Sequence, residues 1–183
     1  AENCYNCHIV RDEKLVNVGG HPARSKNYNL VSWTQGEVRH NFYTPDYSRS
    51  EDKNLETSQT RKRKLFVVGM LLDLEYSLRS LSTGKTGGGA FRKAMGNRAH
   101  TIINKELPIV IEKLGGADAP AQLLEIKKIA SQIKLSGDPK LVAKAADDLK
   151  APIAAFSETN DGSELAGVDS ILPTSAKGDA WQP

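Results

Sequence analysis

The residues best suited to chemistry lie near the start of the chain, where Cys4 and Cys7 are followed directly by His8. Two thiols at this spacing, on one turn of helix, can form thioether bonds to the two vinyl groups on one edge of a porphyrin. The imidazole that follows is then placed under the iron as an axial ligand. The C-x-x-C-H pattern therefore predicts one covalently attached haem c per chain, held by Cys4, Cys7 and His8.

Three other uses of a thiol pair compete with haem attachment. A disulfide between Cys4 and Cys7 is one of them, but it gives His8 no role. A thioredoxin-like redox pair usually follows a strand in a βαβ unit, and nothing in this sequence has that pattern. A zinc site needs two further ligands at finger spacing, which the remaining histidines do not provide. Haem attachment is the interpretation that uses all three residues.

Cys4, Cys7 and His8 resemble the attachment motif of c-type cytochromes. More loosely, the stretch that follows is similar to haem modules of multihaem cytochromes such as cytochrome c554, in which isolated histidines ligate iron from loops or helices. The segments that carry this looser resemblance are 19–22 and 33–41. The chain departs from that family in having a single haem motif, and its last 120 residues lie outside the resemblance.

The second axial ligand of the iron is left open by the sequence. His40 is our first choice, because a short helix over 33–42 would place it on one face with Trp33. His21, in a Gly-Gly-His-Pro turn, is the alternative distal ligand. Trp33 is expected to wall the haem, and Arg39 is a natural bidentate partner for a haem propionate. The remaining candidate ligands are His100, Met70 and Met95.

Composition excludes several classes of protein. The chain has 183 residues, of which 39% are hydrophobic and 26% charged, in the range of globular proteins. No apolar run reaches 18 residues, so no membrane span is expected. A net charge of +3 is too mild for a nucleic-acid polycation, and two cysteines exclude a multi-disulfide scaffold.

The pattern predicts a mainly α fold with three parts. Residues 1–56 have little periodic pattern, and such a segment is expected to order around a haem that supplies the missing apolar surface. Residues 57–158 are expected to form an antiparallel four-helix bundle. Residues 159–183 are rich in Gly, Asp, Ser and Pro and are expected to form an extended C-terminal arm.

Four amphipathic stretches define the bundle. The first has a 4-3-4-3 apolar repeat that ends near Gly84, and the second is expected over 90–114 with a kink at Pro108. The third is expected to begin at Asp118, and the fourth to carry a late kink at Pro152. The repeat of the first helix is Val67, Leu71, Leu74, Leu78 and Leu81. It favours an intramolecular seam, with a homodimer interface as the alternative use.

Three further features invite a functional interpretation that we discount. Residues 82–86 look like the end of a P-loop, but Arg79 stands where the first glycine is required. The basic run 61–64 indicates a solvated face, with docking onto an acidic redox partner as the alternative. His100 falls on the expected apolar face of the second helix, which is typical of a core or cap histidine.

These observations predict a monohaem c-type cytochrome that carries single electrons and meets redox partner proteins, with neither nucleic acid nor membrane span involved. The alternatives are a haem enzyme or gas-binding sensor with an open distal site, or a haem subunit of a larger redox assembly. Haem c is attached outside the cytoplasm, and the chain begins at Ala1 as a processed protein would. We therefore expect a periplasmic or extracellular location.

Overall fold

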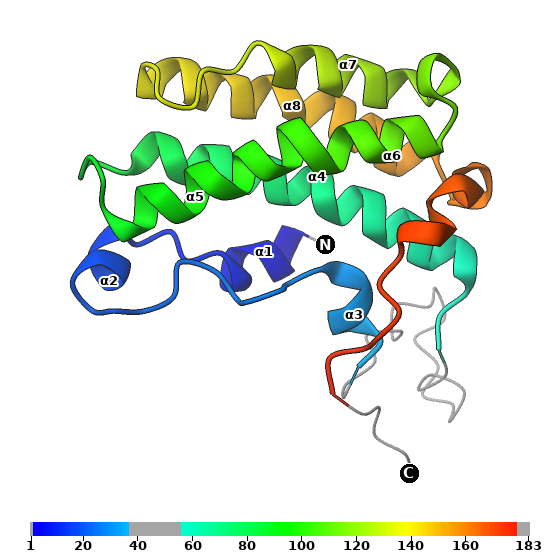
Figure 1. The fold of residues 1–183 in the computed structure, drawn as a ribbon, viewed down its shortest axis with the longest axis horizontal. Coiled ribbons are helices and arrows are strands. Elements are labelled where there is room, and N and C mark those ends of the chain that lie inside the picture. The colour runs from blue at the N-terminus through cyan, green and yellow to red at the C-terminus, as the bar shows by residue number, and fades with distance from the viewer. Residues whose placement is uncertain (1, 37–55, 179–183) are drawn as a thin grey trace.

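A computed structural model describes residues 2–36 and 56–178 of the chain, and these are mainly helical (Figure 1). Within these two stretches there is no β-strand, only an isolated bridge between Ile9 and Arg24. The mainly α fold class is therefore confirmed. None of the helices in the described part is long and apolar enough to cross a membrane.

Helix α4, Gln59–Thr83, lies at the centre of the fold and packs against α8, Pro139–Thr159, and α5, Ala90–Thr101. The Ser58 side chain accepts a hydrogen bond from the Arg61 N–H and caps the start of α4. The helix ends at Gly84, as predicted. Its apolar repeat is buried inside the chain, which confirms the intramolecular seam: Val67, Leu71, Leu74, Leu78 and Leu81.

The second predicted helix forms, but the disturbance caused by Pro108 differs from a simple kink. A π-helical turn, Ile102–Glu106, connects α5 to α6, Leu107–Lys113. The Leu107 N–H donates to the Ile102 carbonyl, five residues back, so the wider turn absorbs the proline that lacks an N–H. The two helices continue as a nearly straight rod in Figure 1.

The last two predicted helices are α7, Ala121–Ser131, and α8, which pack on each other. Helix α7 begins three residues later than predicted, because Gly115 and Gly116 adopt positive φ and lead into a short 3-10 turn, Gly116–Asp118. Asp138 caps α8 by accepting from the Lys140 N–H at 2.9 Å. Pro152 lies inside α8, which nevertheless continues for seven further residues to Thr159.

In the N-terminal segment, residues 2–36 contain three short helices: α1, Glu2–His8, α2, Glu13–Asn17, and α3, Leu30–Thr34. They lie along one side of α4 and α5 in Figure 1. Residues Tyr5, Ile9 and Leu30 are fully buried in the same hydrophobic core as α4. Over residues 2–36, α4 therefore supplies much of the apolar surface that we expected a haem to provide, and residues 37–55 of this segment lie outside the described residues.

Helix α2 also holds the glycine-rich loop between α4 and α5. The Glu13 carboxylate accepts hydrogen bonds from the N–H groups of Lys85 and Thr86, at 2.7 and 2.8 Å. The Asn17 side chain accepts from the Phe91 N–H at 2.9 Å in the first turn of α5. These backbone donors are occupied by a carboxylate and an amide of the chain itself, which agrees with discounting the P-loop resemblance.

The C-terminal segment differs from the extended arm that was predicted. Residues Ser163–Ile171 form 3-10 helical turns that bury Leu165 and Val168 completely. A Cβ at Gly167 would lie 1.9 Å from the Lys113 carbonyl oxygen, so glycine permits this close approach to the end of α6. After the turns the chain runs back to α3, where the Lys177 N–H donates to the Ser32 carbonyl at 2.9 Å.

Part of the basic run at the start of α4 holds the C-terminal 3-10 turns in place. Arg63 makes two hydrogen bonds to the Asp169 carboxylate, at 2.8 and 2.6 Å, and Gln59 adds a third at 2.8 Å. Lys62 pairs with Glu56. At least two of the four cations therefore have partners within the chain, which favours an intramolecular role over docking for that half of the run.

The hydrogen bonds from Arg63 and Gln59 lower the pKa of Asp169 to about 2, from 3.8. We expect a carbon-13 NMR titration of the Asp169 carboxyl to have its midpoint at about 2. A lowered carboxyl pKa stabilises the fold above the unfolded value, and that contribution is lost as the pH falls from 3.8 to about 2. Between these two pH values, the melting temperature of Asp169→Asn should therefore fall less than that of the wild type. Equal falls in the two proteins would contradict a stabilising role of the Asp169 carboxylate.

Candidate functional site

The C-x-x-C-H motif occupies helix α1, so its chemistry is presented by a short, preformed helix. Cys4, Cys7 and His8 have positions i, i+3 and i+4, which share one face of a helix. Cys7 is exposed, Cys4 is half-buried, and neither thiol forms a disulfide. The disulfide that the sequence left open is thus absent from the structure, and both sulfur atoms are free for covalent attachment.

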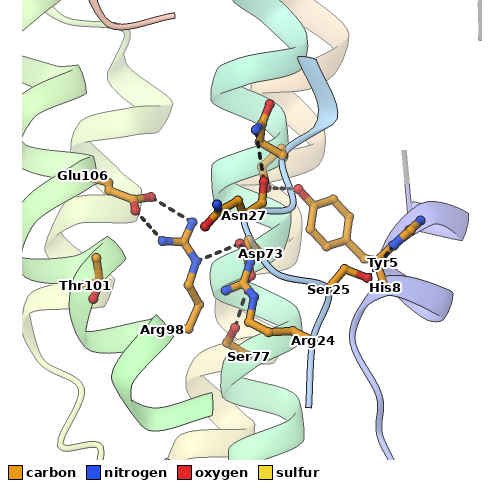
Figure 2. Close-up of polar contacts among 12 residues, drawn as sticks. Tyr5, His8, Arg24, Ser25, Asn27, Asp73, Ser77, Arg98, Thr101 and Glu106 are labelled. Atoms are coloured by element: carbon orange, nitrogen blue, oxygen red, sulfur yellow. Dashed lines mark hydrogen bonds and ion pairs between the residues drawn. The ribbon is translucent and has the colours of Figure 1, made fainter. Parts of the chain in front are cut away.

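His8 is held by groups from two other segments. Its Nδ1 atom lies 2.9 Å from the Ser25 hydroxyl (Figure 2). Its ring stacks on Tyr28 with centroids 4.2 Å apart and an angle of 11° between planes. The Trp33 ring lies in a T-shaped arrangement with His8, with centroids 4.8 Å apart. When Nδ1–H donates to Ser25, the lone pair of Nε2 is left for a metal, the arrangement usual for histidine ligands.

The protonation state of His8 also suits metal binding. Burial lowers the pKa of His8 below its usual value, because desolvation penalises the charged ring. A neutral imidazole is the form that binds a metal ion. Burial and the nearby Cys4 thiol raise the pKa of Tyr28 far above its usual value, so the Tyr28 hydroxyl stays protonated beside the motif.

Tyr5, inside the motif, fixes α1 to α4. Its hydroxyl donates to the Gly69 carbonyl at 2.7 Å, and its ring is 1% exposed (Figure 2). The ring packs edge-on against Tyr28 at 5.3 Å and at a tilt against Tyr76 at 5.8 Å. A Cβ at Gly69 would lie 3.2 Å from the Tyr5 hydroxyl oxygen, so the small residue leaves room for the ring.

The structure brings together four of the predicted site residues: Cys4, Cys7 and His8 on α1, and Trp33 on α3 beside His8. His21 is exposed, and its Nδ1–H donates to the Pro22 carbonyl at 2.8 Å. This bond leaves Nε2 of His21 free. Arg39 and His40 lie outside the described residues.

The other candidate ligands are less well placed. Met95 is completely buried in the core, and Met70 is 6% exposed beside a cavity described below. The placement of His100 on the apolar face is wrong, because the side chain is exposed. The buried stripe of α5 is Phe91, Met95 and Ala99, and it continues at Ile102 in the π-helical turn, so His100 lies one residue away from it.

Sequence reasoning missed three residues of the site: Tyr5, Ser25 and Tyr28. The variable positions of the motif carry no pattern that marks Tyr5 as an anchor. Ser25 and Tyr28 lie in a loop without periodicity. The only local feature that could have drawn attention to this loop is the isolated aromatic residue Tyr28. Their roles depend on contacts with His8 and α4 that no local pattern contains.

The donor set suits a covalently attached haem. Two thiols outside any disulfide and one neutral imidazole share one face of α1, and Tyr28 and Trp33 are the aromatic neighbours of His8. Over the residues that the structure describes, no group of three or more His, Cys, Asp or Glu side chains is arranged to hold a metal ion directly. Comparison of the chain with protein-family models, curated proteins and solved structures finds no significant match.

Proposed function

We propose that the protein is a monohaem c-type cytochrome that carries single electrons in an extracytoplasmic electron-transfer chain. The observation that carries this proposal is the contact of His8 Nδ1 with the Ser25 hydroxyl at 2.9 Å, on the same helix as two thiols that form no disulfide. With Nδ1–H as the donor in this contact, Nε2 is the ligand atom. Bound haem would supply a one-electron couple and the covalent bonds of Cys4 and Cys7 would retain it. His8 is the proposed proximal ligand.

The distal ligand decides between electron transfer and the alternative function. His40 is the proposed ligand and His21 the second choice; a filled sixth position leaves no vacancy for a substrate. A haem enzyme or gas sensor would instead keep that position open. The exposed His21, with a free Nε2, is available for either role. We place the protein in the periplasm or outside the cell, with redox proteins as partners.

The helices are proposed to serve as the scaffold of this site. The packing of α4 on α5 and α8, and of α7 on α8, supports the antiparallel four-helix bundle expected from the sequence. In this arrangement α4 carries the motif helix through Tyr5 and Gly69. Helix α4 thereby fixes the helix that carries His8.

The proposal is tested on the full chain produced with its natural export and haem-attachment machinery. Its intact mass should equal the polypeptide plus one haem, and the variant Cys4→Ser/Cys7→Ser should have the polypeptide mass alone. The absorption spectrum of the reduced protein should be low-spin and unchanged by carbon monoxide. A matured wild-type protein with the bare polypeptide mass would overturn the proposal, and rapid binding of carbon monoxide would favour the open-site alternative.

Single histidine variants locate the distal ligand in the same preparation. His40→Ala should convert the ferric electron paramagnetic resonance signal from low-spin to high-spin. His100→Ala is the matched control, because its side chain is exposed on α5, and it should leave the signal unchanged. If His21→Ala loses the low-spin signal and His40→Ala keeps it, His21 is the distal ligand and His40 is not. A His/Met ligand signature in the wild type would exclude both histidines as the distal ligand.

A further inference from the structure

A cavity of about 630 Å³ lies between the loop that follows α2, helices α4 and α6, and the chain that follows the 3-10 turns. Cys4, Cys7 and His8 do not line it, so it is distinct from the candidate haem site. The two sites share Tyr28, which lines the cavity and stacks on His8. Its volume is in the range of pockets that bind small organic molecules.

One end of the cavity is a charged network without net charge. Asp73 is 1% exposed and accepts hydrogen bonds from Arg24 and Arg98, both at 2.8 Å (Figure 2). Arg98 also makes two hydrogen bonds to Glu106. Two guanidinium groups therefore face two carboxylates, and an ionic occupant would gain no net attraction while losing its hydration. An uncharged occupant is favoured.

This end still has hydrogen-bond donors to offer. A guanidinium group has five N–H bonds, and within the described residues Arg24 uses its Nη2 atom alone, toward Asp73. Asn27 also lines the cavity, with an exposed amide and a left-handed backbone at φ 55°. Free donors beside satisfied carboxylates match carbonyl or hydroxyl oxygens on a bound molecule.

The opposite part of the cavity is apolar and contains aromatic and sulfur side chains. Phe66 and Met70 of α4, Ile109 and Val110 of α6, and Tyr28 all line it. Aromatic rings and thioethers pack well against flat aromatic molecules. The lining therefore favours a ring as the apolar body of the occupant.

The π-helical turn places Arg98 and Glu106 on the same side of the helix that lines the cavity. Residues eight apart on an uninterrupted α-helix, such as Arg98 and Glu106, point about 80° apart. The extra residue of the π turn places Glu106 where the seventh residue would lie, nearly in line with Arg98. The backbone irregularity thus assembles the charged end of the cavity, and such turns occur frequently at functional sites.

We propose that this cavity binds an uncharged aromatic molecule with carbonyl oxygens, of the quinone class, through the Arg24 donors at its polar end and the apolar side chains of α4 and α6. The site does not depend on haem attachment, since Cys4, Cys7 and His8 do not line it, although Tyr5, which lies between the two cysteines, does. Tyr28 lines the cavity and stacks on His8, so it links the two sites.

The test is isothermal titration calorimetry of the matured full chain with duroquinone, whose four methyl groups limit addition by thiols. We expect one site per chain. Ile109→Trp fills the cavity from a residue that is 37% exposed and should weaken binding at least about ten-fold. Leu141→Trp, at a 65% exposed position on α8, is the matched control and should change the affinity less than about two-fold.

Arg24→Lys separates recognition from stability, because lysine keeps a positive charge next to Asp73 but lacks the planar fork of donors. It should weaken duroquinone binding about ten-fold while leaving the far-ultraviolet circular dichroism unchanged. The absence of measurable heat with the wild type, equal affinities of the two Trp variants, or tighter binding of 1-naphthoate than of duroquinone would overturn the proposal. Haem content, measured separately by mass, shows whether the proposed function stands independently.

Discussion

Replacement of Asp73 by alanine is expected to lower the free energy of unfolding by about 3 kcal/mol. The carboxylate is 1% exposed and joins Arg24 of the N-terminal segment to Arg98 of α5. Its removal leaves Arg24 without its partner and Arg98 with Glu106 alone, and a buried charge that loses its partner is strongly destabilising. Urea unfolding followed by circular dichroism measures the effect.

The matched control is Asp148→Ala on α8. Asp148 pairs with Lys144 one helical turn away, but both side chains are largely exposed, at 43% and 67%. Exposed pairs of this kind contribute about 0.5 kcal/mol or less. Equal losses in the two variants would show that Asp73 is not a buried junction between the N-terminal segment and the helices.

Replacement of Tyr5 by alanine should cost about 3 kcal/mol, the usual loss when a fully buried aromatic side chain is truncated. The variant also loses the hydrogen bond from the hydroxyl to Gly69 and the ring contacts with Tyr28 and Tyr76. Because these contacts attach α1 to α4, amide hydrogen exchange in α1 should accelerate more than exchange in α8.

Tyr5→Phe is the conservative partner of this experiment. It keeps the ring and removes one hydrogen bond, and we expect a loss of about 1 kcal/mol. Burial raises the pKa of Tyr5 well above its usual value, so the hydroxyl donates over the whole working pH range. If the amide exchange rates of α1 in Tyr5→Ala equal those of the wild type, contacts other than those of Tyr5 hold the motif helix.

The helices of the second half were predictable because their burial follows a local period. Val67 to Leu81 repeats with the turn of an α-helix, and Gly84 ends it, so the residue pattern alone is enough to place α4. The turn at Ile102–Glu106 was not predictable, because a π-helical turn changes the period by one residue within a continuous helix. The same shift explains why Ile102 is buried and His100 is exposed.

Contacts between distant segments were beyond sequence reasoning. The motif itself identified Cys4, Cys7 and His8, because its spacing is a property of neighbouring residues. The partners of His8 come from a loop and from α3, and the 3-10 turns that bury Leu165 have too short a period to register as amphipathic. Long-range packing on α4 decided these features.

Helices α1, α2 and α3 have seven, five and five residues, too few to persist without tertiary support. Their anchors join residues 64 positions apart at Gly69 and 72 positions apart at Lys85. During synthesis, the cysteine-bearing end must therefore remain without stable helix until α4 and the loop that follows it are complete. Under the proposed function, both thiols remain accessible to the attaching enzyme during this delay. Their accessibility to the enzyme ends when folding is complete.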